Sequence, residues 1–459
     1  MLSVAGQTPR GAELAKGKTI EKIVIETDES QTYALYLPSS YDASKKFPVI
    51  YCFDPRARGG VAVERFRVAA EKYGYIVIGS NTSQNGVDNK ILSSIISNLW
   101  DETQRRFSID ERRVIAAGFS GGARVASSIA FSCNGCIFGV IGSGAGFSPG
   151  STINEKMPFL FFGTAGYNDF NYPEMRLLSK KLTGLNVTHR FEVFDGSHQW
   201  LDETLSREAL GWFELQAMKA NRRAKDDALI EELFQTRVRR ADAYIADKKY
   251  LEAYSTYAGI AADFAQWRDV SVFADKIMSL EKSSELKQAI KSESEQFREQ
   301  DQEAGEIGSL GEKLSDNGEK LSAHFELRQK IETLRKKSAE TNDSPARRVA
   351  RRTVDLLRIQ AFESALFHLE RDGKLAMALT DLELAGEISP KDPQIYYYRA
   401  RIYATQGDKK KAIESLTKAV ELGMKDIDRL TNEKSFQMLR NDESFLKLVA
   451  VLKGSSGSE

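Results

Sequence analysis

The sequence is poor in cysteine and histidine, and it has no long apolar run. Only 3 cysteines and 4 histidines occur among its 459 residues. Three cysteines are too few for the disulfide framework that holds small secreted domains together. No stretch of 18 or more apolar residues occurs, which argues against a membrane-spanning helix. A formal net charge of zero gives no reason to expect binding to nucleic acid or to an anionic membrane surface.

The cysteines and the chain ends leave the cellular compartment open. Cys133 and Cys136 are separated by two residues, and such a pair forms either a local disulfide or two free thiols. Residues 1–9 lack basic charge and an apolar core, so they do not form a signal peptide, although the remnant of one would look the same. Residues 454–459 predict a flexible tail. We expect a periplasmic or secreted protein if a leader was removed, and a cytoplasmic one otherwise.

The composition changes near residue 220. Before it, short apolar runs alternate with helical segments; after it, the chain is highly charged, poor in glycine and helical in pattern. Alternating strands and helices indicate a mostly parallel sheet covered by helices on both faces. The expected strands cover 20–27, 32–37, 47–53, 75–80, 114–117, 138–141, 158–163 and 187–194, and the expected helices cover 61–73, 88–107, 123–130, 173–182 and 203–220. We predict an α/β domain over 1–220, a charged helical region over 221–345, all-α helical repeats over 346–453 and a tail over 454–459.

A repeated spacing occurs in the second half. Gly373 and Gly407 are 34 residues apart, and the pairs Ala378 and Ala412, and Ala385 and Ala419, have the same separation. This period, with small residues where two helices of a hairpin cross, is typical of tetratricopeptide repeats. A weaker copy runs over 241–260, where Lys248 stands at the glycine position. Repeats of this kind favour a protein or peptide partner, although they can also pack on their own enzyme.

One serine in the first half stands in a pattern that suits a nucleophile. A buried strand over 114–117 leads into Gly118-Phe119-Ser120-Gly121-Gly122 and then into a helix. A sharp strand-to-helix turn exposes the serine hydroxyl and needs small neighbours, which the glycines of G-x-S-x-G provide. The N–H of Gly121, at the start of the helix, is suited to hold an oxyanion. The alternative is a glycine-rich turn with an incidental serine.

The base and the acid that such a serine needs follow in chain order. Two of the four histidines, His324 and His368, lie in the helical half, and His189 lies inside a strand. His198 follows that strand, on a loop at the carboxyl edge of the sheet, and Asp169 is the only carboxylate on the loop after the preceding strand. The order Ser120, Asp169, His198 is the α/β-hydrolase order. A capping or surface role is the alternative for Asp169.

The remaining site candidates are less sharply defined. The second oxyanion donor is expected on the loop after the strand over 47–53, from the backbone of Asp54 or Arg56, because the proline between them has no N–H. Three aromatic residues beside the proposed groups are candidates for contacts with the substrate: Phe119, Tyr167 and Trp200. No metal or cofactor is implied.

Residues 1–220 resemble the α/β-hydrolase fold. They are similar to compact bacterial esterases grouped with poly(3-hydroxybutyrate) depolymerases, feruloyl esterases and dienelactone hydrolases. The matching pieces are residues 118–122, Asp169 with the three residues after it, and His198 with the two after it. The resemblance implies Ser120 as nucleophile, His198 as base and Asp169 as orienting acid. The chain departs from the family in having no histidine-glycine pair on the oxyanion loop, and residues 346–453 resemble tetratricopeptide repeats.

The function predicted is hydrolysis of a carboxylic ester, on a small molecule or a polymer, through a Ser-His-Asp triad and an acyl-enzyme. Two alternatives stay open. A serine peptidase of the same fold would use the same groups. A protein-binding repeat module could instead retain the hydrolase half as a non-catalytic scaffold.

Overall fold

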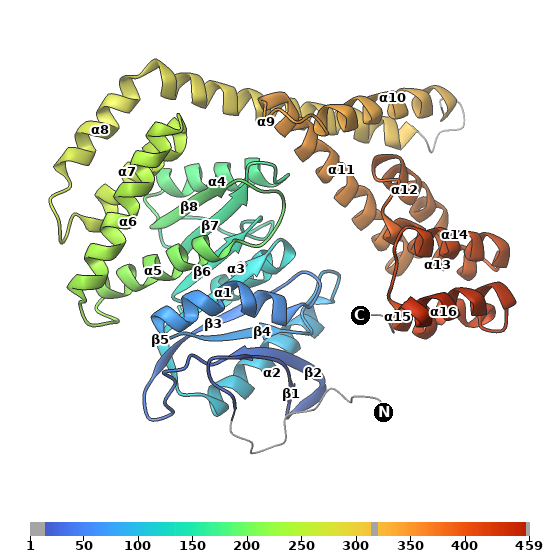
Figure 1. The fold of residues 1–459 in the computed structure, drawn as a ribbon, viewed down its shortest axis with the longest axis horizontal. Coiled ribbons are helices and arrows are strands. Elements are labelled where there is room, and N and C mark those ends of the chain that lie inside the picture. The colour runs from blue at the N-terminus through green and yellow to red at the C-terminus, as the bar shows by residue number, and fades with distance from the viewer. Residues whose placement is uncertain (1–13, 134, 314–319, 456–459) are drawn as a thin grey trace. The chain divides into compact units, whose positions relative to one another are not determined.

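The computed structural model describes residues 14–133, 135–313 and 320–455, which form two compact units, Met1–Glu293 and Ser294–Glu459 (Figure 1). The first unit extends past the boundary that the composition predicts at residue 220. The N-terminal residues considered above as the remnant of a leader lie outside the described residues. The two units are taken in turn.

An eight-stranded sheet forms the centre of the first unit. Its strands are β1 (Thr19–Ile25), β2 (Asp28–Tyr36), β3 (Phe47–Phe53), β4 (Ile76–Ser80), β5 (Ile109–Phe119), β6 (Gly139–Ser143), β7 (Leu160–Gly166) and β8 (His189–Phe194). Their order is β1-β2-β4-β3-β5-β6-β7-β8. The pairs β1–β2 and β2–β4 are antiparallel, and all later pairs are parallel. The predicted α/β class is confirmed, and this strand order is that of the α/β-hydrolase fold.

Helices cover both faces of the sheet, because the central strands are apolar on both sides. The flanking helices are α1 (Gly59–Tyr73), α2 (Asn89–Arg106), α3 (Gly121–Ser132), α4 (Tyr172–Gly184) and α5 (Glu203–Lys219). Ile50 and Cys52 share a core with α1 and α5. Tyr51 and Phe53, the alternate residues of β3, face α2 and α3 instead. Cys133 and Cys136, after α3, form a disulfide.

Three further helices complete the first unit: α6 (Asp227–Ala246), α7 (Tyr250–Phe264) and α8 (Ser271–Lys282). They share an apolar core with Leu215 and Met218 of α5, so they pack against the α/β layers of the first unit. The α6–α7 hairpin contains residues 241–260, which the sequence suggests as a weaker repeat copy, and Lys248 adopts φ 59° in its turn. That is the left-handed conformation for which glycine would be preferred.

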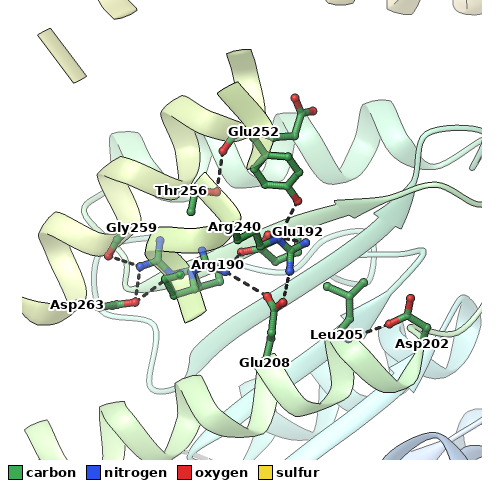
Figure 2. Close-up of polar contacts among 12 residues, drawn as sticks. Arg190, Glu192, Asp202, Leu205, Glu208, Arg240, Glu252, Thr256, Gly259 and Asp263 are labelled. Atoms are coloured by element: carbon green, nitrogen blue, oxygen red, sulfur yellow. Dashed lines mark hydrogen bonds and ion pairs between the residues drawn. The ribbon is translucent and has the colours of Figure 1, made fainter. Parts of the chain in front are cut away.

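Buried ion pairs fix this hairpin to the last strand of the sheet (Figure 2). Glu192 of β8 accepts a hydrogen bond from Arg237 of α6 at 2.6 Å and lies 3.5 Å from Arg240. Both arginines also pair with Glu208 of α5. A second pair joins Arg190 of β8 to Asp263 of α7. Burial raises the pKa of Glu192, but attraction to the two α6 guanidinium groups outweighs it and leaves that pKa lowered. The network therefore holds Glu192 as a carboxylate.

The second unit is built from helical hairpins. Helix α9 (Ser284–Lys313) begins in the first unit; it is followed by α10 (Lys320–Ser338), α11 (Pro345–Glu370), α12 (Leu375–Ile388), α13 (Pro393–Thr405), α14 (Lys409–Glu421), α15 (Ile427–Asn432), the 3-10 helix Lys434–Leu439 and α16 (Glu443–Ser455). Ala378, Ala385, Ala412 and Ala419 are fully buried in the hairpin cores. This confirms the reason given for the small residues at a period of 34. Helix α16 extends two residues into the predicted tail, whose other four residues lie outside the described ones.

Candidate active site

Ser120 occupies a strained turn between β5 and α3. Its backbone has φ 53° and ψ −123°, a region that costs a non-glycine residue on the order of 1–3 kcal/mol. Close packing around the turn explains the glycines. A Cβ on Gly118 would lie 2.1 Å from the Gly122 carbonyl carbon, and one on Gly122 would lie 2.0 Å from the Phe53 oxygen. The Ser120 N–H donates to the Ser143 carbonyl at 2.9 Å, which ties the turn to the end of β6.

His198 and Asp169 meet at the same edge of the sheet. His198 Nδ1 lies 2.9 Å from Asp169 Oδ1, a hydrogen bond that fixes the ring orientation and leaves Nε2 as the other ring nitrogen. The Asp169 carboxylate is fully buried. Its Oδ1 also accepts the backbone N–H of Asn171 at 2.8 Å, and the Asn171 side-chain amide donates to the Gly144 carbonyl at 2.8 Å. Asp169 is thus held by its own loop, which Asn171 joins to the loop after β6.

Aromatic rings place His198 beside the serine turn. Its ring lies 4.6 Å from that of Phe119, the residue before Ser120, and 4.2 Å from that of Phe170. A Cβ on Gly144 would come within 3.0 Å of His198 Nδ1. Among the described residues, no hydrogen bond joins Ser120 Oγ to the His198 ring. Such bonds are often long without substrate and shorten in the bound complex.

The loop after β3 is organised by the buried side chain of Asp54. Its carboxylate accepts the Arg56 backbone N–H at 2.9 Å, two bonds from Arg58 at 2.9 Å each, and the indole N–H of Trp200 at 2.8 Å. The Arg56 N–H therefore already has an acceptor. The Asp54 N–H is closer to the serine turn, since a Cβ on Gly122 would lie 3.2 Å from that nitrogen. Of the two predicted donors, these contacts favour Asp54.

The three aromatic candidates for substrate contact are all buried, with 8% of Phe119, 9% of Tyr167 and 4% of Trp200 exposed. Phe119 packs on His198, and Trp200 bonds Asp54. Tyr167 faces α7, where burial and the nearby carboxylate of Glu252 raise its pKa. Their contacts are thus with protein groups, and a role in substrate binding stays a prediction.

The helices after residue 220 also contact the acid-bearing loop. Tyr172, at the start of α4, donates to the carboxylate of Glu293 on α9, and Arg176 donates to it at 3.0 Å. Arg176 also lies 3.7 Å from Glu252 of α7. These pairs hold the beginning of α4, three residues after Asp169, against the helical part of the first unit.

Three neighbours of the site were not found from the sequence. Asn171 carried a recognisable signal, since it lies two residues after Asp169 at the N-cap of α4. Gly144 and Asn85 carried none, because each reaches the site from a loop distant in sequence. Within the part of the chain that the structure describes, no group of three or more His, Cys, Asp or Glu residues is arranged to hold a metal ion, and no helix is long and apolar enough to cross a membrane.

Comparisons with known proteins cover only part of the chain. A search of curated proteins returns no match. Among solved structures, the chain is similar to a Staphylococcus aureus S-formylglutathione hydrolase (16% identity, 45% of this chain and 99% of that one, TM-score 0.34). It is similar to a Bacillus cereus carboxylesterase (18% identity, 41% of this chain and 96% of that one, TM-score 0.34). It is also similar to a ferulic acid esterase (17% identity, 42% of this chain and 95% of that one, TM-score 0.33). The family model of the tetratricopeptide repeat matches residues 393–426, so the segment from α13 to α14 belongs to that repeat family.

Proposed function

We propose that this chain is a serine hydrolase of carboxylic esters. One observation carries the proposal. His198, which shares a hydrogen bond of 2.9 Å with Asp169, packs on Phe119, and the next residue is the strained, glycine-flanked Ser120. A sheet needs none of these features for stability alone. A turn with φ above zero at serine costs free energy, and a buried carboxylate needs a partner. Strain of this kind is common where it presents a reacting group.

The residues suggest roles in two half-reactions. Ser120 Oγ attacks the acyl carbon while His198 Nε2 takes its proton, and the Asp169 carboxylate stabilises the resulting imidazolium. The Gly121 N–H and a backbone N–H after β3, for which Asp54 is favoured, hold the oxyanion. His198 then returns the proton to the leaving alcohol. Water, activated by the same histidine, releases the acid from the acyl-enzyme.

The repeat segment has a separate role in this proposal. Tetratricopeptide repeats stack helix pairs into surfaces that take up peptides or proteins, and residues 393–426 match their family model. We infer that the second unit binds a protein or peptide partner, whereas ester hydrolysis depends on the first unit.

The test is labelling with a fluorophosphonate probe, followed by a panel of short aryl, acetyl, feruloyl and peptide substrates. Wild type should be labelled and the Ser120→Ala variant should not. Equal labelling of the two proteins, or none of wild type, would remove the enzyme proposal and leave the binding-module alternative. Cleavage of peptides but not esters would replace the esterase by a peptidase.

A further inference from the structure

Asn85 lies on the loop after β4, and its side chain reaches Gly121 in the serine turn. Its backbone N–H donates to the Pro55 carbonyl at 2.9 Å, and the preceding residue, Gln84, forms a β-bridge with Arg56. The start of the same loop is fixed by the Ser80 hydroxyl, which accepts two backbone N–H groups. The loop that carries Asn85 is therefore held against the loop after β3, which carries the second proposed oxyanion donor.

The side chain of Asn85 rests against Gly121. A Cβ built on Gly121 would lie 1.9 Å from Asn85 Oδ1 and 3.0 Å from Nδ2. A side chain at position 121 would therefore have to displace the Asn85 amide, which occupies the space that a Cβ would fill. Oδ1 is the nearer end of this amide, and rotation about the broad, two-fold χ2 of asparagine brings Nδ2 to the same place. The amide thus lies next to the residue whose N–H is the proposed oxyanion donor.

The amide of Asn85 is also available to a substrate. The residue is exposed, and no hydrogen bond among the described residues uses its side-chain amide. An asparagine amide offers two N–H donors. The Asp54 carboxylate and the Arg56 N–H, by contrast, already have hydrogen-bond partners.

We propose that the Asn85 side-chain amide donates a hydrogen bond to the carbonyl oxygen of the bound ester, beside the Gly121 N–H. This inference rests on the proposed ester hydrolysis. As the bond from Ser120 Oγ to the acyl carbon forms, the carbonyl electron pair moves onto oxygen and the serine proton moves to His198. The amide stabilises that oxygen without transferring a proton, and the charge is lost again when the C–O bond to the alcohol breaks. The chain lacks the histidine-glycine pair on the loop after β3, and this side chain adds a donor from the next loop.

The experiment measures kcat and KM for p-nitrophenyl acetate. Asn85→Ala should lower kcat by roughly 10²-fold, as removal of one oxyanion donor does, with KM nearly unchanged. Asn89→Ala, a second exposed asparagine near the loop, should match wild type. Wild type and Ser120→Ala are run alongside. If they hydrolyse the ester equally, the proposed function fails and this inference with it; if wild type alone is active and Asn85→Ala has wild-type kcat, only the Asn85 proposal is overturned.

Three further variants separate a donor from a merely structural loop residue. Gly121→Ala places a methyl group where the amide lies, so it should displace Asn85. The double variant with Asn85→Ala should then be no slower than the Gly121→Ala variant, because both changes remove the same interaction. In Asn85→Asp the introduced carboxyl donates only when protonated. Its activity relative to wild type should rise as pH falls, and additive losses together with a flat pH ratio would refute the proposal.

Discussion

Replacing Arg240 by methionine should strongly destabilise the first unit. Arg240 is 18% exposed and contacts Glu192 and Glu208, which are 6% and 13% exposed. The change leaves two buried carboxylates facing one guanidinium, that of Arg237. Removing one partner of a buried pair costs about 3–5 kcal/mol, because the remaining charge has no compensation. For a unit of a few hundred residues each kcal/mol lowers the melting temperature by roughly 2–4 °C, so a fall of roughly 6–20 °C is expected.

Thermal unfolding followed by circular dichroism, together with ester hydrolysis, measures the effect. The double variant Arg240→Met with Glu208→Gln restores the charge balance around Glu192 and Arg237, so it should recover much of the loss. Arg239→Met is the matched control, since this neighbour is exposed and surface substitutions change stability by about 0.5 kcal/mol or less. A single variant as stable as the control, or a double variant no better than the single one, would refute the view that these charges join α6 to the sheet.

Three other outcomes are expected. Asp169→Asn should lower kcat by roughly 10⁴-fold, because an amide cannot hold His198 in the required tautomer. Kinetics on p-nitrophenyl acetate measure kcat, and a loss under tenfold would contradict the proposed role of Asp169. Burial lowers the pKa of His189, so the unfolded chain binds more protons below about pH 6.5 and stability falls with acidification. The melting temperature of His189→Asn should therefore drop less than that of wild type between about pH 7.5 and 5.5. An equal drop in the two proteins would contradict the contribution of His189 to this pH dependence. A fragment of 1–220 should aggregate, since it exposes the α5 residues that pack on α6–α8, whereas 1–293 should stay monomeric in size-exclusion chromatography.

The sequence predicts most of the first unit because its strands are local, apolar and regularly spaced. The strand over 47–53 has the predicted bounds, and the serine turn lies where the glycines indicate. The pairing of His198 with Asp169, which share a hydrogen bond, could be predicted because few histidines and few loop carboxylates occur in this half; their roles as base and acid stay a prediction. The composition changes at residue 220, whereas the first compact unit extends to Glu293, because composition does not show that α6–α8 pack on α5. Arg237 and Arg240, whose side chains are only 13% and 18% exposed, pair with Glu192 of β8 and Glu208 of α5.

Contacts between loops that are distant in sequence cannot be predicted from local sequence patterns. Asn85 and Gly144 approach the site through space, and neither stands in a periodic pattern or a motif. Lys248 shows that a local residue preference can also fail to predict the structure. Its repeat position prefers glycine, and the hairpin forms with a lysine at φ 59°, so packing on α5 outweighs a local preference of about 1 kcal/mol.

The bond between Asp54 and Trp200 has a consequence for altering the site. It joins the loop after β3 to the loop that carries His198, two segments 146 residues apart in sequence. A substitution that widens the site at Trp200 would leave a buried carboxylate short of one donor and loosen the opposite loop. Changes in the substrates accepted there would therefore be inseparable from changes in rate, and engineering for bulkier esters would begin more safely at exposed positions on other loops.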